Sequence, residues 1–205
     1  YTWVTRSRDG GKTWSEPAAI NVAELGWGSP FGKIVTMPDG AMLMAIYGGP
    51  RRPIGEKVAK DRDHSYVYRS TDNGQTWKYF AEIGDGKQQL NETALLRHSS
   101  GRLIAALRSR AGDVWLSDST DGGRTWSKTR QLTPAMVHPA DLIELDDGRA
   151  LLVVGNRVGP FGVLGLVSDR QQQFDWSQRF TLVDDAKALD CGYPSSVKLA
   201  GNRAL

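Results

Sequence analysis

Cysteine, histidine and long apolar runs are all scarce in this chain of 205 residues. Cys191 is the single cysteine, which excludes an internal disulfide and a metal site built from cysteines. The three histidines, at positions 64, 98 and 138, are too widely spaced to form a metal-ligand pattern. No run approaches the roughly 18 consecutive apolar residues of a membrane-spanning helix. We therefore expect no metal, no cofactor and no membrane span.

A strong charge of either sign is also missing. The net charge is +3, from 26 basic and 23 acidic residues, and no basic run carries interleaved aromatic residues, so we expect no nucleic-acid partner. No stretch keeps apolar residues at helical spacing across three turns, which argues against helices. With 40% hydrophobic and 24% charged residues, the composition is that of an ordinary globular domain.

One eight-residue pattern, Ser-x-Asp-x-Gly-x-Thr-Trp, recurs along the chain. It occupies residues 7–14, 70–77 and 119–126, which we call the Asp turns, and a degenerate copy lies near 168–176. The last two steps between the starting serines are both 49 residues (119−70 and 168−119). A fixed period of this size is typical of solenoids, propellers or arrays.

Each Asp turn has the residue types of a self-stapled tight turn. The carboxylate can accept hydrogen bonds from turn N–H groups, and glycine permits a positive φ. The tryptophan offers a large apolar face to the preceding strand. We therefore assign structural roles, and no catalytic role, to the aspartates and tryptophans of these turns: Asp9, Trp14, Asp72, Trp77, Asp121 and Trp126.

A second repeated pattern, a turn containing glycine between two β-type runs, occurs at Gly40, Gly101, Gly148 and Gly201. Each repeat thus carries two hairpins, and four strands in about 50 residues make one propeller blade. We expect residues 1–205 to form a single partial β-propeller domain with about four blades' worth of strands. The chain begins and stops in the middle of a repeat. Because a ring leaves no unpaired strand edges, we expect further blades of the same propeller to complete it.

Strand register brings four polar residues together. Counting from the hairpin glycines places Glu92, Arg108, Arg157 and Tyr193 at one end of the inner strands, opposite the Asp turns. Each has a structural alternative: the arginines could fasten blades together, the tyrosine could belong to the core, and the glutamate could be a solvated strand start. Because charged groups near an axis are costly unless they are paired or bind a ligand, the convergence of all four favours a site.

These residues carry a resemblance to the sialidase superfamily. The Asp turns resemble its Asp-box, or bacterial neuraminidase repeat. The segment 91–108 resembles one in which a glutamate precedes an active-site arginine by one hairpin. The segment 192–197 resembles the one that carries the nucleophilic tyrosine, and Arg157 lies where another substrate-binding arginine would fall. The resemblance implies a six-bladed propeller, with secretion or a periplasmic location suspected.

The resemblance further implies an exo-glycosidase that removes terminal sialic acid, or a related acidic sugar, from glycans with retention. Tyr193 would be the nucleophile, Glu92 its base, and Arg108 and Arg157 the clamp on the substrate carboxylate. A neutral nucleophile suits a substrate with a carboxylate at its anomeric carbon, and sialidases are an exception to the two-carboxylate scheme. An acidic-polysaccharide-active propeller, either a lyase or a hydrolase, and a non-catalytic glycan-binding propeller remain open alternatives.

Two parts of the family pattern are missing. Family members have an arginine in an early Phe-Arg-Ile-Pro-type segment and an aspartate that acts as acid and base. The corresponding strand start here is 29–32, Ser-Pro-Phe-Gly, which has no arginine. Asp61 and Asp63 lie in a loop after the polar insertion at 50–57, and neither is assigned. We expect both missing groups to lie in an N-terminal blade outside this chain, and the chain alone to be inactive.

Overall fold

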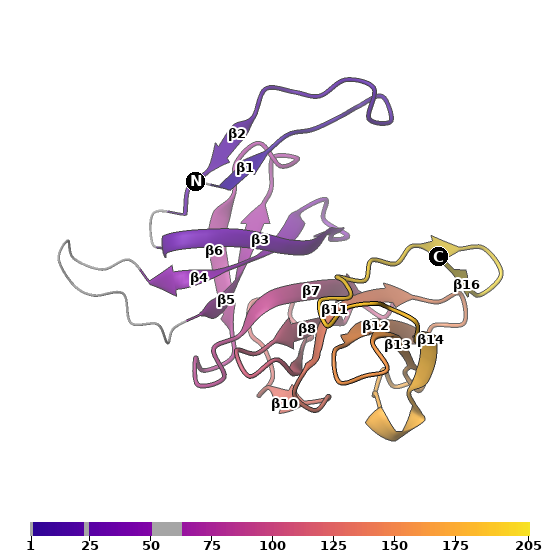
Figure 1. Cartoon of the computed structure of the whole chain (residues 1–205). Coiled ribbons are helices and arrows are strands. Elements are labelled where there is room, and N and C mark those ends of the chain that lie inside the picture. The colour runs from indigo at the N-terminus through magenta and orange to yellow at the C-terminus, as the bar shows by residue number, and fades with distance from the viewer. Residues whose placement is uncertain (1, 23–24, 51–62) are drawn as a thin grey trace.

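The computed structural model describes residues 2–22, 25–50 and 63–205, and the regular secondary structure of these residues is almost entirely β-strand. Within these ranges the strands form three four-stranded antiparallel sheets and two short hairpins (Figure 1). The first sheet contains β3 (Leu25–Thr36), β4 (Met42–Pro50), β5 (His64–Ser70) and β6 (Lys78–Ile83). The second contains β7 (Asn91–Arg97), β8 (Leu103–Arg108), β9 (Val114–Ser119) and β10 (Arg130–Gln131). The third contains β11 (Val137–Glu144), β12 (Ala150–Asn156), β13 (Gly162–Val167) and β14 (Phe180–Val183).

The two hairpins lie at the ends of the chain. They are β1 (Thr2–Val4) with β2 (Ala18–Ile20), and β15 (Lys198–Leu199) with β16 (Arg203–Ala204). In every four-stranded sheet the strands are neighbours in chain order, so each sheet is a meander. The tight turns between the first two strands contain Gly40, Gly101 and Gly148, all with φ between 78 and 89°. A positive φ of this size is what glycine permits at no steric cost, so the predicted all-β architecture of four-stranded antiparallel units is confirmed.

The three Asp turns close by the same set of hydrogen bonds. In the first, the backbone N–H and the hydroxyl of Thr13 donate to Asp9, at 2.9 and 2.6 Å, and Ser7 Oγ donates to the same carboxylate at 2.8 Å. The indole N–H of Trp14 donates to the carbonyl of Gly11 at 3.1 Å. These bonds, led by the Thr13 hydroxyl, lower the pKa of Asp9 to about 2. Its carboxylate is thus committed to the turn.

The three turns differ in how their tryptophan rings pack. Trp77 is buried, with 5% of its surface exposed, whereas Trp14 is 63% exposed. Trp126 packs against the core cluster between the first two sheets. The expectation that each tryptophan covers the preceding strand is therefore wrong for Trp14, whose turn joins only the two-stranded β1–β2 hairpin. Because the bond pattern is the same in all three turns, local chemistry forms the turn without help from the core.

The sheets pack face to face through their first strands. Strand β7 contacts both β3 and β4, and β11 contacts both β7 and β8. One apolar cluster between the first and second sheets includes Leu43, Val67 and Leu107, all fully buried. Another between the second and third sheets includes Leu116 and Leu152. The strands β3, β7 and β11 thus lie side by side, with β7 in the middle (Figure 1).

The last part of the chain differs from the sequence-based prediction. A strand was expected to begin near Tyr193, but residues 184–197 have no regular structure, and β15 is only two residues long. This segment returns across the third sheet toward β7, in yellow in Figure 1. In the degenerate fourth repeat the Asp169 carboxylate still closes a turn, accepting hydrogen bonds from the N–H groups of Gln171 and Gln173 at 2.9 and 2.8 Å, and a 3₁₀ turn, η1 (Trp176–Gln178), follows it.

Of the polar insertion at 50–57, residues 51–57 lie outside the described residues, and so does Asp61. Among the described residues, no helix has the length and apolar character needed to cross a membrane.

Candidate active site

Glu92 and Arg108 meet at one end of the second sheet. In the antiparallel ladder Asn91 pairs with Arg108 and Thr93 pairs with Leu107, so Glu92 is the extra residue of a bulge. A bulge turns a side chain out of the ordinary alternation of a strand. Glu92 is only 8% exposed, and its Oε2 accepts a hydrogen bond from Arg108 Nη1 at 2.8 Å. The bulge therefore presents a buried carboxylate to the last residue of β8.

Tyr193 reaches the same carboxylate from 101 residues further along the chain. Its hydroxyl donates to Glu92 Oε1 at 2.8 Å, and Arg108 Nη1 lies 3.5 Å from the phenol oxygen. The ring centroid lies 6.0 Å from that of Phe31 in β3. Tyr193 remains 51% exposed. The phenol is thus oriented by a buried acid while one side stays open to a ligand.

Arg157 contacts the face of the Tyr193 ring but not Glu92. Its guanidinium carbon lies 5.9 Å from the ring centroid, and its Nε donates to the carbonyl of His138 at 3.3 Å. Its Nη1 forms an ion pair of 2.9 Å with Asp190 Oδ1. The four residues that the strand register predicted to lie together therefore form one contiguous group, with Tyr193 at its centre.

A second carboxylate, from β11, anchors the segment that carries Tyr193. Asp141 in β11 is 6% exposed, and its Oδ2 accepts hydrogen bonds from both the N–H and the hydroxyl of Ser196, each at 2.7 Å. Lys33 Nζ, from β3, lies 2.5 Å from the same oxygen. This contact joins the first sheet, the third sheet and the segment three residues beyond Tyr193.

Close backbone packing holds the other side of the segment. A Cβ atom at Gly155 would lie 3.1 Å from the Gly192 carbonyl oxygen and 2.8 Å from that of His138. Glycine therefore lets the segment lie directly against β12. Cys191 adds a hydrogen bond of 3.3 Å from Sγ to the carbonyl of Asn156. Tyr193 is thus fixed by contacts on both sides, although it belongs to no strand.

The electrostatics keep the phenol protonated and the arginine charged. Burial, and then the hydrogen bond to Glu92, raise the pKa of Tyr193. Burial alone would lower the pKa of Arg108, but the hydrogen bond and charge of Glu92 outweigh it and the pKa is raised. Burial, together with the charges of Arg108 and Arg157, lowers the pKa of His138 to about 4. His138 is therefore a neutral neighbour of two cations at pH 7.

Both arginines keep a buried nitrogen without an acceptor in the described part of the chain. These atoms are Nε of Arg108 and Nη2 of Arg157, and Nδ1 of His138 beside them is also unpaired. Buried polar atoms without partners cost free energy and call for an explanation. An anionic ligand with two oxygens is the kind of group to which such nitrogens would donate hydrogen bonds.

The sequence-based reasoning missed several residues of this group, among them Asp190, Phe31 and the Lys33–Asp141 pair. None belongs to a motif: the packing of β3 and β11 against β7 brings Phe31, Lys33 and Asp141 close, and the returning segment adds Asp190. Asp63, left unassigned, lies at the edge of the group, where its Oδ2 accepts a hydrogen bond of 3.0 Å from Asn91. Where the chain is described, no group of three or more His, Cys, Asp or Glu side chains is arranged to hold a metal ion.

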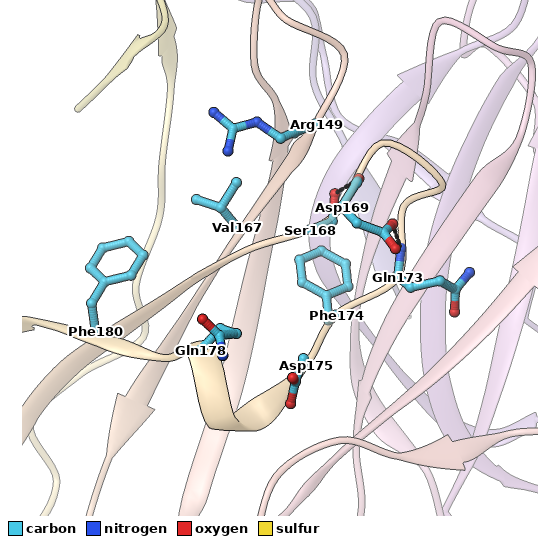
Figure 2. A pocket seen from close by; sticks show the side chains of 9 residues that line it. All are labelled: Arg149, Val167, Ser168, Asp169, Gln173, Phe174, Asp175, Gln178 and Phe180. Atoms are coloured by element: carbon cyan, nitrogen blue, oxygen red, sulfur yellow. Dashed lines mark hydrogen bonds between the residues drawn. The ribbon is translucent and has the colours of Figure 1, made fainter.

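A separate hollow of about 620 Å³ lies at the opposite end of the third sheet (Figure 2). Phe174 and Phe180 line it together with several polar groups. Those polar groups are already used: Arg149 pairs with Asp147 at 2.7 Å, and Asp175 caps η1. Because the hollow offers mainly satisfied side chains, the group around Tyr193 is the stronger candidate site.

Meander sheets packed through their first strands define this chain as a sialidase-like β-propeller. The model of the BNR repeat-like domain matches residues 1–203. The chain belongs to this BNR repeat-like family.

Solved structures of the same fold include enzymes with different substrates. A protein of unknown function from Dyadobacter fermentans is 20% identical with a TM-score of 0.64, and the match covers 98% of this chain and 77% of that one. A sialidase from Streptococcus pneumoniae is 18% identical with a TM-score of 0.61, covering 89% of this chain but 29% of its own. An α-L-arabinofuranosidase from Fusarium graminearum is 19% identical with a TM-score of 0.66, covering 88% and 58%. At these identities the likeness extends to the fold alone.

Proposed function

We propose that this chain carries the nucleophile side of a glycoside hydrolase active site of sialidase type, which removes a terminal acidic sugar from a glycan. The observation that carries the proposal is the hydrogen bond of 2.8 Å from the Tyr193 hydroxyl to Glu92. A phenol with an ordinary pKa near 10 is a weak nucleophile at neutral pH and needs an adjacent base. Glu92 is within the reach that proton transfer requires.

In the first step the Tyr193 oxygen attacks the anomeric carbon while its proton passes to Glu92. The bond to the leaving oxygen breaks, and the leaving group takes a proton from an acid other than Glu92, Arg108, Arg157 and Tyr193. Water then attacks the same carbon and gives up a proton to the conjugate base of that acid, while the bond to the Tyr193 oxygen breaks and the phenol recovers its proton from Glu92. Two displacements at one carbon give net retention. Arg108 holds the second oxygen of Glu92 at 2.8 Å, which keeps the base in place.

The substrate carboxylate is assigned to the arginines. Guanidinium groups bind carboxylates through two parallel N–H donors. Arg108 and Arg157 flank the phenol, and each has a buried nitrogen without an acceptor within the described residues. A carboxylate at the anomeric carbon would reach them while that carbon faces the phenol oxygen.

Hydrolysis of a fluorogenic sialoside by the natural protein that contains this chain tests the proposal. Tyr193→Phe removes the nucleophile but keeps the ring packing, and we expect activity to fall by about 10²–10⁴-fold, with a comparable loss for Glu92→Gln. Tyr79→Phe serves as the matched control and should retain activity. Wild-type protein without turnover on sialosides would remove the sialidase assignment.

A second candidate is a glycosidase of the same fold that acts on a different sugar. Both arginines are already paired with carboxylates, Arg108 with Glu92 and Arg157 with Asp190, so the group carries little net positive charge. One structural neighbour is an α-L-arabinofuranosidase. Turnover of an arabinofuranoside, with none of a sialoside, would favour this candidate.

A further inference from the structure

The ion pair between Arg157 and Asp190 places one of the protein's own carboxylates where a ligand carboxylate is expected. Asp190 Oδ1 lies 2.9 Å from Arg157 Nη1. The Arg157 side chain is only 11% exposed, whereas that of Asp190 is 76% exposed. The partner of the buried arginine is therefore a side chain that is mostly exposed to water.

The two arginines of the site differ in how firmly they are paired. Glu92, the partner of Arg108, is buried and also binds the Tyr193 hydroxyl. Moving it would break two contacts at once. Asp190 lies in the irregular segment 184–197 and can turn into water without losing a buried position. Because an ion pair with an exposed partner is weaker than one whose members are both buried, this contact is the one that a ligand can exchange.

The geometry of the pair also leaves Arg157 incompletely satisfied. Asp190 contacts Nη1, while the buried Nη2 has no acceptor in the described residues. A carboxylate that presents both oxygens to a guanidinium forms two parallel hydrogen bonds. A ligand carboxylate that reaches both nitrogens would therefore bind Arg157 better than Asp190 does.

We propose that Asp190 is a specificity-determining residue, whose carboxylate occupies Arg157 in the free protein and is exchanged for the carboxylate of an acidic sugar. The inference rests on the proposed function in assigning the ligand to this group. A neutral sugar offers nothing to replace Asp190 and leaves the pair intact. The carboxylate of an acidic sugar replaces that of Asp190 and also binds Nη2 of Arg157. The ion pair therefore makes the site select negatively charged sugars over neutral ones.

Binding of two closely matched probes tests the exchange. Sialic acid and its methyl ester differ in the charge of one group, and titration calorimetry measures the affinity of each. Removing the competing carboxylate with Asp190→Asn should tighten binding of the acid about two- to fivefold, the range expected when the displaced partner is an exposed carboxylate. Binding of the methyl ester should not change. Asp185→Asn, the same charge change five residues away, should alter neither affinity.

The outcomes separate this inference from the proposed function. A tighter acid complex in Asp190→Asn, in a protein that turns over no glycoside, would retain the exchange and remove the hydrolase assignment. Turnover by the wild type with unchanged or weaker acid binding in Asp190→Asn would overturn the exchange. Failure of the acid to bind either protein would overturn it as well. Circular dichroism of both variants shows whether the fold is retained, and a crystal structure with the acid should show Asp190 turned away from Arg157.

Discussion

Asp141 and Ser196 are joined through a single carboxylate oxygen, which accepts both the backbone N–H and the hydroxyl of Ser196 at 2.7 Å. The two residues are 55 positions apart. Lys33 brings a third donor to the same oxygen. Because Ser196 lies three residues after Tyr193, this contact holds the segment in the position from which the phenol reaches Glu92.

Asp141→Asn should destabilise the fold and loosen the Tyr193 segment. The amide keeps the size of the side chain but loses the charge that holds three donors. Breaking a buried pair costs about 3–5 kcal/mol, and since Lys33 can reach water we expect the lower part of this range or slightly less, about 2–3 kcal/mol. Urea unfolding measures the loss. Asp184→Asn, on the exposed part of the same segment, should stay within about 0.5 kcal/mol of wild type, and equal stabilities for the two variants would contradict the anchoring role.

His138 should make stability depend on pH. Its pKa falls from 6.5 to about 4 on folding, first because of burial and then because of Arg108 and Arg157. As pH falls the unfolded chain takes up the proton first, so the stabilisation is complete above about pH 6.5 and is lost toward pH 4. Between pH 7.5 and 4.5, the wild type should lose about 2–3 kcal/mol more than His138→Gln. Unfolding at both pH values measures the difference, and parallel losses in the two proteins would contradict it.

Trp77 and Trp14 should differ sharply although they end identical turns. Trp77→Ala removes a buried ring and should cost about 3–5 kcal/mol. Trp14→Ala removes a ring that is 63% exposed and should cost less than about 1 kcal/mol. Chemical denaturation of the two variants provides the comparison, each acting as the control of the other. Similar losses would mean that the turn itself, rather than the packing of its ring, sets the stability.

Local patterns were enough to predict the repeating architecture. A turn such as 119–126 contains every group that it needs: Thr125 and Ser119 both bind the carboxylate of Asp121. The hairpin glycines likewise act within a few residues. These interactions are short in sequence, and their residue types are fixed by φ and by hydrogen-bonding capacity, so a repeated pattern predicts a repeated structure.

Register predicted part of the site. Glu92 and Arg108 lie in paired strands, and counting from Gly101 places them together because the ladder is regular from the turn as far as the Thr93–Leu107 pair. The bulge at Glu92, which turns its side chain, was not predicted. Exposure was also misjudged: Trp14 has the pattern of a buried ring, but the strands around it form only a two-stranded hairpin.

The contacts around Tyr193 depended on the return of an irregular segment. Its position follows from Asp141 and from the close approach that Gly155 allows, and neither belongs to a motif. Asp190 joins the group with the same segment, whereas Lys33 reaches Asp141 because β3 and β11 both pack against β7. Periodicity has no bearing on such contacts, because they form between residues far apart in sequence whose separation depends on how whole sheets pack.

By itself, therefore, the sequence determined the strands, the turns and the repeat, because each is stabilised by groups only a few residues apart. Tertiary structure alone decided which carboxylate faces which arginine, and how far the phenol of Tyr193 stays open to water. Those features arise where separate sheets meet, and their energies depend on burial and distance that no local pattern contains.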